Sequence, residues 1–294
     1  MSQFNALLTH LEQQTGHSLQ NHRLSSVGGG DINSAYKLQT ANLTWFIKLN
    51  HAGLYDMFAA EAAGLQELAA SASVRVPQLI SVGQFGQHAY LVLEFIDLRP
   101  LHGASAGLFG EQLALLHRQK QAYFGWQRDN TIGSTPQHNP KYPDWLSFWQ
   151  QQRLGKQLQF AAANGYGGNL QKQGGKLNAG LAALFRTYQP QASLLHGDLW
   201  GGNAGADQHG VPVMYDPACY YGDRETDLAM TELFGGFGPD FYAAYQAHWP
   251  LDAGYPARKT LYNLYHILNH LNLFGSSYLG QANNMIQRLL SELS

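Results

Sequence analysis

The sequence predicts an α+β fold with two lobes, a small β-rich lobe over residues 1–97 and a larger, mostly helical lobe over residues 98–294. Two observations support this prediction. The first hundred residues contain several extended apolar runs and one prominent helical pattern, whereas after Pro100 the apolar residues recur mainly at helical spacing. Runs of strands followed by runs of helices are typical of α+β architectures.

The small lobe is predicted to contain two helices and four strands, identified from the hydrophobic period and from turn residues. The helices are expected over residues 2–15 and 56–70, and the strands over residues 32–39, 43–49, 76–82 and 89–95. A polar turn near Thr40 joins the first two strands into a hairpin, which a glycine-rich loop precedes. A turn over residues 83–86 separates the last two strands.

The larger lobe is predicted to be almost entirely helical. Helices are expected around the apolar stripe from Phe109 to His117 and over residues 145–160, 225–234, 240–248, 258–274 and 281–293. A short strand is expected over residues 211–215, and the glycine-rich stretch over residues 164–175 predicts a flexible connection.

The composition indicates a compact globular protein. Of the 294 residues, 45% are hydrophobic, which is enough to fill the cores of two lobes. Only 13% are charged, about half of the ~25% that is usual in soluble domains, and the net charge is −2. Nucleic-acid binding normally requires clustered Lys and Arg, and the basic residues here are scattered. We therefore expect no nucleic-acid partner.

The chain lacks the sequence features of a membrane or secreted protein. No apolar run approaches the ~20 residues that span a bilayer. The first residues lack the positive region and apolar core of a secretion signal, and the single cysteine, Cys219, cannot form an intrachain disulfide. A cytoplasmic location without a membrane partner is therefore expected, while the oligomeric state stays open.

The most specific motif is the stretch from His196 to Asn203, which reads His-Gly-Asp-Leu-Trp-Gly-Gly-Asn. Asp198 and Asn203 have the Asp-x-x-x-x-Asn spacing of a kinase catalytic loop, and Asp216 follows at the end of an apolar run. Phosphoryl transfer needs a carboxylate near the hydroxyl nucleophile and oxygen ligands for Mg²⁺, and these three residues provide both. The alternative is that Asp198 only caps a turn.

Lys48 lies inside the apolar run of residues 45–49, where an unpaired ammonium group would be costly to bury. Glu61, in the next predicted helix, is the expected partner, and Glu67 is the competing one. A Lys–Glu ion pair of this kind aligns the lysine with ATP phosphates. The alternative is a lysine at a sheet edge whose amino group reaches solvent.

Two segments of the small lobe are candidates for nucleotide binding through their backbone. Gly28, Gly29 and Gly30 precede the predicted hairpin, and glycines allow amide groups to approach phosphates closely. Backbone groups of Glu94 and Ile96, at the end of the small lobe, are candidates for hydrogen bonds with an adenine edge. The alternatives are an ordinary hairpin turn for the glycines and a core strand for Glu94 and Ile96.

A charged cluster from Asp223 to Asp227 precedes an apolar helical pattern. It is either a solvated helix start with capping side chains or a support for the catalytic loop through Asp227. The sequence favours neither interpretation.

Taken in chain order, these residues resemble the protein-kinase-like superfamily, in its aminoglycoside and choline phosphotransferase branch. Three longer motifs narrow the resemblance to the fructosamine kinase, or ketosamine 3-kinase, family. They are Gly-Gly-Gly-Asp-Ile-Asn from Gly28, the stretch from His196 to Asn203, and Asp-Pro-Ala-Cys-Tyr-Tyr-Gly-Asp-Arg-Glu-Thr-Asp-Leu-Ala-Met from Asp216. The resemblance covers nearly the whole chain, and the last two motifs are the specific ones.

The resemblance implies a bilobal protein-kinase-like fold and ATP-dependent phosphorylation of the sugar 3-hydroxyl of ketosamines, free or protein-bound, as a deglycation step. It implies that Asp198 is the base that orients the sugar hydroxyl, that Asn203 and Asp216 hold Mg²⁺, and that Lys48 binds ATP phosphates. Trp200 would offer an aromatic face to the ketosamine, or alternatively pack beneath the loop.

One position departs from the family pattern, since many members carry Cys after the three glycines, where this chain has Asp31. A redox switch in this loop is therefore not expected. Two other functions stay open: a kinase for another hydroxylated small molecule, such as an aminoglycoside, choline or a sugar, and a non-catalytic nucleotide-binding protein. The joint presence of Lys48, Asp198, Asn203 and Asp216 argues against the second.

Overall fold

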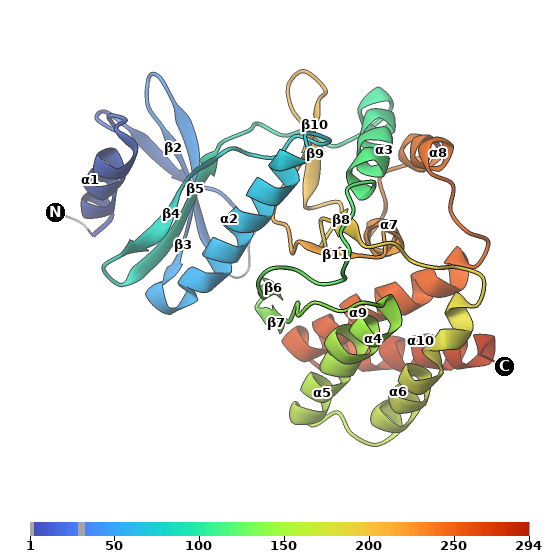
Figure 1. Ribbon diagram of the computed structural model, residues 1–294. Coiled ribbons are helices and arrows are strands. Elements are labelled where there is room, and N and C mark those ends of the chain that lie inside the picture. Colours follow the sequence, from blue (N-terminus) through green and yellow to red (C-terminus); the bar gives the residue numbers. More distant parts are fainter. Residues whose placement is uncertain (1–2, 29–32, 294) are drawn as a thin grey trace.

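The computed structural model describes residues 3–28 and 33–293, and it shows a sheet with flanking helices joined to a larger helical body (Figure 1). The bilobal α+β fold predicted from the sequence is confirmed. Gly29, Gly30 and Asp31 lie outside the described residues. The division of the chain between residues 97 and 98 stays a prediction.

The β-rich lobe is built on one antiparallel sheet in the order β1-β2-β3-β5-β4. Its strands are β1 (Arg23–Ser26), β2 (Ser34–Gln39), β3 (Thr44–His51), β4 (Leu79–Phe85) and β5 (His88–Glu94). Helix α1 (Gln3–Thr15) covers one face of the sheet (Figure 1). Helix α2 (Tyr55–Ala70), which follows a 3-10 turn at Ala52–Leu54, covers the other. The sequence pattern does not predict β1, because Leu24 is its only apolar residue.

The alternation of β3 explains why both faces of the sheet are covered. Trp45 and Ile47 pack in one apolar cluster with α1, whereas Phe46 packs in another with α2. Successive residues of a strand point to opposite faces, so Lys48 shares a face with Phe46. The ammonium group of Lys48 is thereby directed to the side of α2, where Glu61 lies.

The strand around Gly83 differs from the prediction. The sequence places a turn over residues 83–86, but β4 continues through Gly83 to Phe85, and the turn begins only at Gly86. Gly83 pairs with Tyr90 of β5, and a Cβ at Gly83 would lie 2.6 Å from the hydroxyl oxygen of that tyrosine. Gly83 is glycine because the ring of Tyr90 crosses over it, and not because the chain turns there.

The helical lobe packs around one large core of aliphatic and aromatic side chains. Its helices are α3 (Ala104–His117), α4 (Trp145–Phe148), α5 (Gly155–Ala163), α6 (Asn169–Gly180), α7 (Glu225–Leu233), α8 (Pro239–His248), α9 (Tyr255–Phe274) and α10 (Leu279–Glu292), with 3-10 turns at Leu181–Phe185 and Ser276–Tyr278. A π-helical turn, Trp149–Leu154, links α4 to α5.

The connection predicted over residues 164–175 is wrong for its second half, because α6 begins at Asn169 and only residues 164–168 link it to α5. Leu170 and Gly174 lie on the buried side of this helix. A Cβ at Gly174 would come within 2.7 Å of Leu158 in α5. At Gly174, therefore, glycine allows close packing of two helices and does not indicate flexibility.

Three pairs of short strands complete the helical lobe. They are β6 (Asn130–Ile132) with β7 (Thr135–Gln137), β8 (Ser193–Leu195) with β11 (Tyr220–Gly222), and β9 (Ala204–Ala206) with β10 (Pro212–Met214). Of these, the sequence predicts β10. The pairing of β8 with β11 aligns Leu195 with Tyr220, so the segment that follows β8 and the segment that precedes β11 are neighbours. These two segments carry Asp198 and Asp216.

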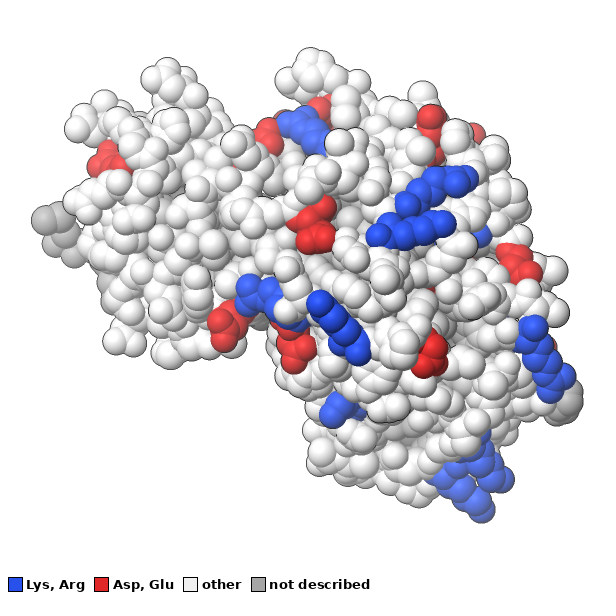
Figure 2. All heavy atoms as spheres, in the orientation of Figure 1, with Lys and Arg blue, Asp and Glu red and all other residues white. Residues whose placement is uncertain are grey.

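The surface shows the low charge content of the chain. On the face in Figure 2, few charged side chains lie over the β-rich lobe, and the basic side chains are spread over the helical lobe. Within residues 3–28 and 33–293, no helix is both long enough and apolar enough to cross a membrane.

Candidate active site

Asp227 of α7 holds the start of the catalytic loop. Its carboxylate accepts hydrogen bonds from the backbone amides of His196, at 2.8 Å, and Gly197, at 2.9 Å, and His117 of α3 contacts it at 3.2 Å. Burial acts to raise the pKa of Asp227, but His117 and these bonds outweigh it and hold the pKa below its ordinary value. Since residues 223–227 are buried, this cluster supports the loop and is not a solvated helix start.

His196 connects the catalytic loop to the segment of Asp216. Its Nε2 donates to the carbonyl of Tyr215 at 2.9 Å, and its Nδ1 accepts from the amide of Asp198 at 3.2 Å, as expected for a neutral imidazole. Burial lowers the pKa of His196, which favours that neutral form. The next residue, Gly197, has a φ of +84°, and a Cβ there would overlap the carbonyl oxygen of Ala218.

Asp198 and Asn203 contact each other across the loop. The side-chain amide of Asn203 donates to the carbonyl of Asp198 at 2.9 Å and to its carboxylate at 3.2 Å. Because the amide nitrogen of Asn203 is used in this way, its amide oxygen is the atom available to a metal ion. Burial, and to a smaller extent the charge of Asp216, raises the pKa of Asp198 to about 7.

Lys48 joins carboxylates from both lobes. Its Nζ donates to Glu61 at 2.9 Å and also forms an ion pair with Asp216. Burial acts to lower the pKa of Lys48, but the two carboxylates outweigh it and raise the pKa above its ordinary value. The expected partner, Glu61, is thus the one observed, while Glu67 accepts a hydrogen bond from the hydroxyl of Tyr221 at 2.6 Å.

Asp216 has a backbone conformation that is unusual for a residue with a side chain. Its φ is +57°, and its side chain is 41% exposed. Backbone bonds hold the flanking residues, from the amide of Tyr215 to the carbonyl of Asn203 at 3.0 Å and from the amide of Ala218 to the carbonyl of His196 at 2.9 Å. Such strained residues persist only where their surroundings hold them, and they concentrate at functional sites.

The structure describes only some of the other residues predicted to bind the nucleotide. The carboxylate of Glu94 accepts a hydrogen bond from Arg75 at 2.5 Å, and its backbone amide donates to the carbonyl of Gln78 at 2.9 Å, so the carbonyl is the backbone group that remains a candidate for the adenine edge. Among the described residues, no hydrogen bond uses the backbone amide of Ile96. Gly28 is exposed, and its two glycine neighbours lie outside the described ranges.

Trp200 lies between solvent and the loop. Trp200 is 40% exposed. Its ring covers Gly202, where an added Cβ would overlap the ring. An edge contact joins it to Phe234, with the ring centroids 6.3 Å apart. Phe234 in turn contacts His270 at 5.3 Å. The ring is therefore partly exposed, two residues along the chain from Asp198, and it also packs on its own loop.

Sequence reasoning misses three residues that hold the site. His196 belongs to the catalytic motif, so its position beside Asp198 is a signal that could have identified it. Asn130 and Gln137 donate side-chain hydrogen bonds to the carbonyls of Cys219 and Ala218. They lie 89 and 81 residues from those partners, and no spacing in the sequence connects them.

This fold, with a lysine, two acidic residues and an asparagine gathered from both lobes, is that of the protein-kinase-like class. A crystal structure of the aminoglycoside phosphotransferase APH(4)-Ia shares the fold, with a TM-score of 0.64 at 14% identity over 97% of this chain and 98% of that one. A structure of a candidate fructosamine-3-kinase from Haemophilus somnus 129PT has a TM-score of 0.88 at 29% identity, covering 98% and 97%.

Within this class, the chain belongs to the fructosamine kinase family, whose family model matches residues 3–292. The protein named "Probable ketoamine kinase slr1563" from Synechocystis is 46% identical over 95% of this chain and 94% of its own length. A chloroplastic protein-ribulosamine 3-kinase from Arabidopsis thaliana is 41% identical over 95% and 86%.

Proposed function

We infer that this chain is an ATP-dependent ketosamine 3-kinase, which transfers a phosphoryl group to the 3-hydroxyl of a sugar joined to an amine. One observation carries the inference. In a member of the fructosamine kinase family, Lys48, Asp198, Asn203 and Asp216 meet at one site, although they come from separate segments. A family member without activity would be expected to have lost at least one of them.

The proposed roles follow from the chemistry of each side chain. Asp198 accepts the proton of the sugar hydroxyl while the oxygen of that hydroxyl forms a bond to the γ-phosphorus and the bond from the γ-phosphorus to the ADP oxygen breaks. The bond from Asn203 fixes the orientation of this carboxylate. Lys48, held by Glu61, neutralises phosphate charge.

The donor atoms at the site fit Mg²⁺. This ion prefers oxygen ligands and is commonly held by one or two carboxylates together with substrate phosphates. Asp216 supplies a half-exposed carboxylate and Asn203 an amide oxygen, so we propose that these two residues hold the ion. Bound there, Mg²⁺ would neutralise charge on the transferring phosphoryl group.

We propose that residues 1–97 form the nucleotide lobe and residues 98–294 the catalytic and substrate lobe. The backbone of Glu94 and the amide of Ile96 would bind the adenine edge, and Gly28 to Gly30 would cover the phosphates. The free thiol of the buried Cys219 agrees with a cytoplasmic location, which we also propose.

The exposed ring of Trp200 supports a sugar substrate with an apolar face. Neighbouring rings extend it along α7 and α9 to Phe234, His270 and Phe274. A polycationic aminoglycoside would favour acidic side chains at this position, so the aromatic lining favours a ketosamine. Small ketosamines and glycated proteins are both candidate substrates.

The function is tested by ATP consumption on a matched set of acceptors. The set contains fructosamine and ribulosamine derivatives of one amine, an aminoglycoside and choline, and NMR locates the phosphate on the product. We expect turnover on the ketosamines alone, with phosphate on the 3-hydroxyl. Turnover only on the aminoglycoside or choline would favour the other kinase, and Mg·ATP binding without turnover on any acceptor would favour a non-catalytic protein.

A further inference from the structure

We propose that the β6–β7 hairpin positions the metal-binding segment of the active site, and that Gln137 is the positioning residue through which it acts. The inference rests on the proposed function, because it treats Asp216 as a metal ligand. It concerns the backbone that follows Asp216, which strands β6 and β7 reach from another part of the chain (Figure 1).

Two side-chain amides hold this backbone. Gln137 donates from Nε2 to the carbonyl of Ala218 at 3.1 Å, and Asn130 donates from Nδ2 to the carbonyl of Cys219 at 2.8 Å. On the other side of Asp216 along the chain, His196 donates to the carbonyl of Tyr215 at 2.9 Å. The segment that carries Asp216 is therefore held on both sides.

The hydrogen-bonding capacity of the two amides is used in a way that fixes their orientation. Gln137 also donates to Asn130 Oδ1 at 2.9 Å, and its Oε1 accepts from the hydroxyl of Tyr265 at 2.7 Å. Asn139 donates to the same Asn130 oxygen at 3.0 Å. Gln137 is only 1% exposed, so no water can easily replace a lost partner. Satisfied buried networks of this kind specify a single arrangement.

A buried arginine anchors the network. Arg153 is 0% exposed. Its guanidinium group donates to Asn139 Oδ1 at 2.6 Å and to the carbonyl of His138 at 2.8 Å. The same group lies 4.1 Å from the centroid of the Tyr220 ring. Among the described residues, no carboxylate forms an ion pair with it. The π-helical turn Trp149–Leu154 carries it, and such turns occur often at functional sites.

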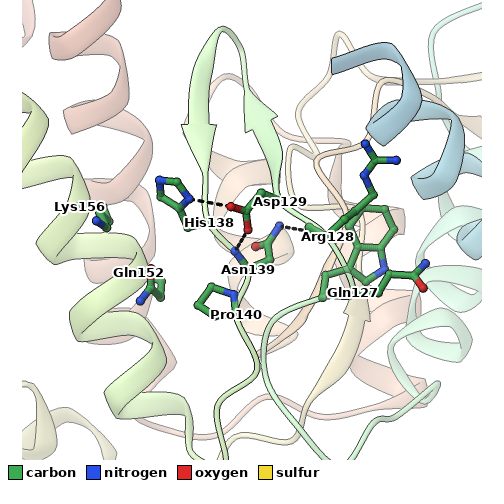
Figure 3. Close-up of a pocket in the computed structure, with 9 residues that line it drawn as sticks. Gln127, Arg128, Asp129, His138, Asn139, Pro140, Gln152 and Lys156 are labelled. Atoms are coloured by element: carbon green, nitrogen blue, oxygen red, sulfur yellow. Dashed lines mark hydrogen bonds and ion pairs between the residues drawn. The ribbon is translucent and has the colours of Figure 1, made fainter. Parts of the chain in front are cut away.

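Hydrogen bonds also hold the base of the β6–β7 hairpin, as Figure 3 shows. The carboxylate of Asp129 contacts His138 at 2.8 Å and accepts from the amide of Asn139 at 2.8 Å, and the side chain of Asn139 donates to the carbonyl of Arg128 at 3.2 Å. The hollow of about 400 Å³ in this view is lined by the same residues and lies beside the anchor. Because both strands are fixed at the base of the hairpin, where Asn130 and Gln137 lie, these two residues act as a rigid support.

The geometry gives a specific expectation for Gln137→Met, which keeps the side-chain length and removes the amide. The carbonyl of Ala218 loses its donor, so the backbone after Asp216 becomes more mobile and the ligand geometry loosens. Loss of a group that orients a metal ligand typically costs about 10- to 100-fold in metal affinity or activity. We expect the apparent Mg²⁺ constant to rise about tenfold, with little change in the KM for the ketosamine.

Gln171→Met is the matched control. Like Gln137, Gln171 donates two hydrogen bonds from Nε2, in its case to the carbonyls of Leu158 and Tyr166, each at 3.0 Å, but it lies in α6 away from this network. Tyr265→Phe is a milder second variant, since it removes the hydroxyl that donates to Gln137 Oε1 and leaves the amide of Gln137 in place, and we expect an intermediate effect from it.

The deciding measurement is amide hydrogen exchange over residues 214–222 in the ligand-free protein. We expect faster exchange in Gln137→Met and Tyr265→Phe but not in Gln171→Met, at comparable losses of melting temperature. Unchanged exchange there, or an Mg²⁺ constant that shifts equally in Gln171→Met, would overturn the inference. If the wild type shows no ketosamine turnover, the proposed function fails, and the exchange result still decides whether the hairpin holds this segment.

Discussion

The carboxylate of Asp198 accepts one side-chain hydrogen bond, from the amide of Asn203. Its neighbour Leu199 is fully buried, so the loop backbone is anchored independently of the Asp198 side chain. A change at Asp198 should therefore affect the chemistry more than the fold.

We expect Asp198→Ala to lower kcat by about 10²- to 10⁴-fold, the range for loss of a general base, while Mg·ATP binding is largely retained. The reason is that proton transfer acts mainly in the transition state. Steady-state kinetics with a ketosamine, together with calorimetric titration of Mg·ATP, would measure both effects. Turnover close to that of the wild type would contradict the assignment of Asp198.

We expect Lys48→Met to reduce turnover by about a hundredfold or more, a usual cost for removing one preorganised electrostatic contact. The variant also leaves Glu61 buried without its cation, so the melting temperature should fall. Kinetics and thermal unfolding measure the two effects. Lys172→Met, at an exposed lysine of α6, is the control for charge removal. If Lys48→Met loses stability but not turnover, the lysine is only structural.

We expect Trp200→Ala to raise the KM for the ketosamine about tenfold, because aromatic contacts are worth on the order of 1 kcal/mol beyond burial. The KM for ATP should change little. Trp200→Phe keeps an aromatic face and should restore most of the affinity. Equal KM values in the wild type and the alanine variant would favour the packing role of Trp200.

At the scale of single residues, the sequence predicts those whose chemistry shows in short motifs. Asp198 with Asn203, and Lys48 with Glu61, have fixed spacings that the structure brings into contact. Gln137 has no such signature, because its function depends on a partner far along the chain. The catalytic and binding roles of Asp198, Asn203, Lys48 and Glu61 stay predictions.

At the scale of elements, periodicity predicts what local sequence determines. The long helix α9 is recognised from its regular apolar pattern, whereas β6 and β7 are missed because three-residue strands have too short a pattern to register. Glycine is the other source of error. The glycine-rich stretch in α6 and Gly83 in β4 both look like chain breaks, but each accommodates a neighbouring side chain.

Two glycines of α3 test this interpretation of glycine directly. A Cβ at Gly110 would overlap the carbonyl oxygen of Phe241 in α8 and lie 3.0 Å from the amide nitrogen of Tyr245. At Gly107, one turn away, the nearest atom is 3.9 Å distant, the carbonyl oxygen of Asp240. The same substitution should therefore have opposite effects at the two positions.

We expect Gly110→Ala to lower the free energy of unfolding by about 1–3 kcal/mol, because overpacking forces α3 and α8 apart. Gly107→Ala should raise it by about 0.5–1 kcal/mol, the usual gain from replacing a helical glycine. Urea unfolding of both variants measures the difference. Similar values at the two positions would show that α3 and α8 do not pack as closely as described.

At the scale of the whole molecule, buried ionisable groups link stability to pH in opposite directions. Burial lowers the pKa of His117, and it lowers the pKa of His266 to about 3. Burial raises the pKa of Glu225 to about 7, although Arg258 opposes it. On acidification the histidines destabilise the fold, whereas a carboxylate with a raised pKa stabilises it. The pH dependence of the free energy of unfolding of the wild type therefore cannot be assigned to one group. A comparison with a single-residue variant can assign it.

His266 offers that comparison, since it is only 5% exposed. Burial is the main cause that lowers its pKa from 6.5 to about 3, and the charge of His270 is the second cause. Above pH 6.5 neither the folded nor the unfolded state carries its proton. Below pH 6.5 only the unfolded chain takes it up, which lowers the free energy of unfolding by about 1.4 kcal/mol per pH unit. Relative to the wild type, His266→Gln should gain about 2 kcal/mol in urea unfolding between pH 7.5 and 5. His102→Gln, at an exposed histidine, is the control. A stability difference between His266→Gln and the wild type that stays constant with pH would mean that folding does not lower the pKa of His266.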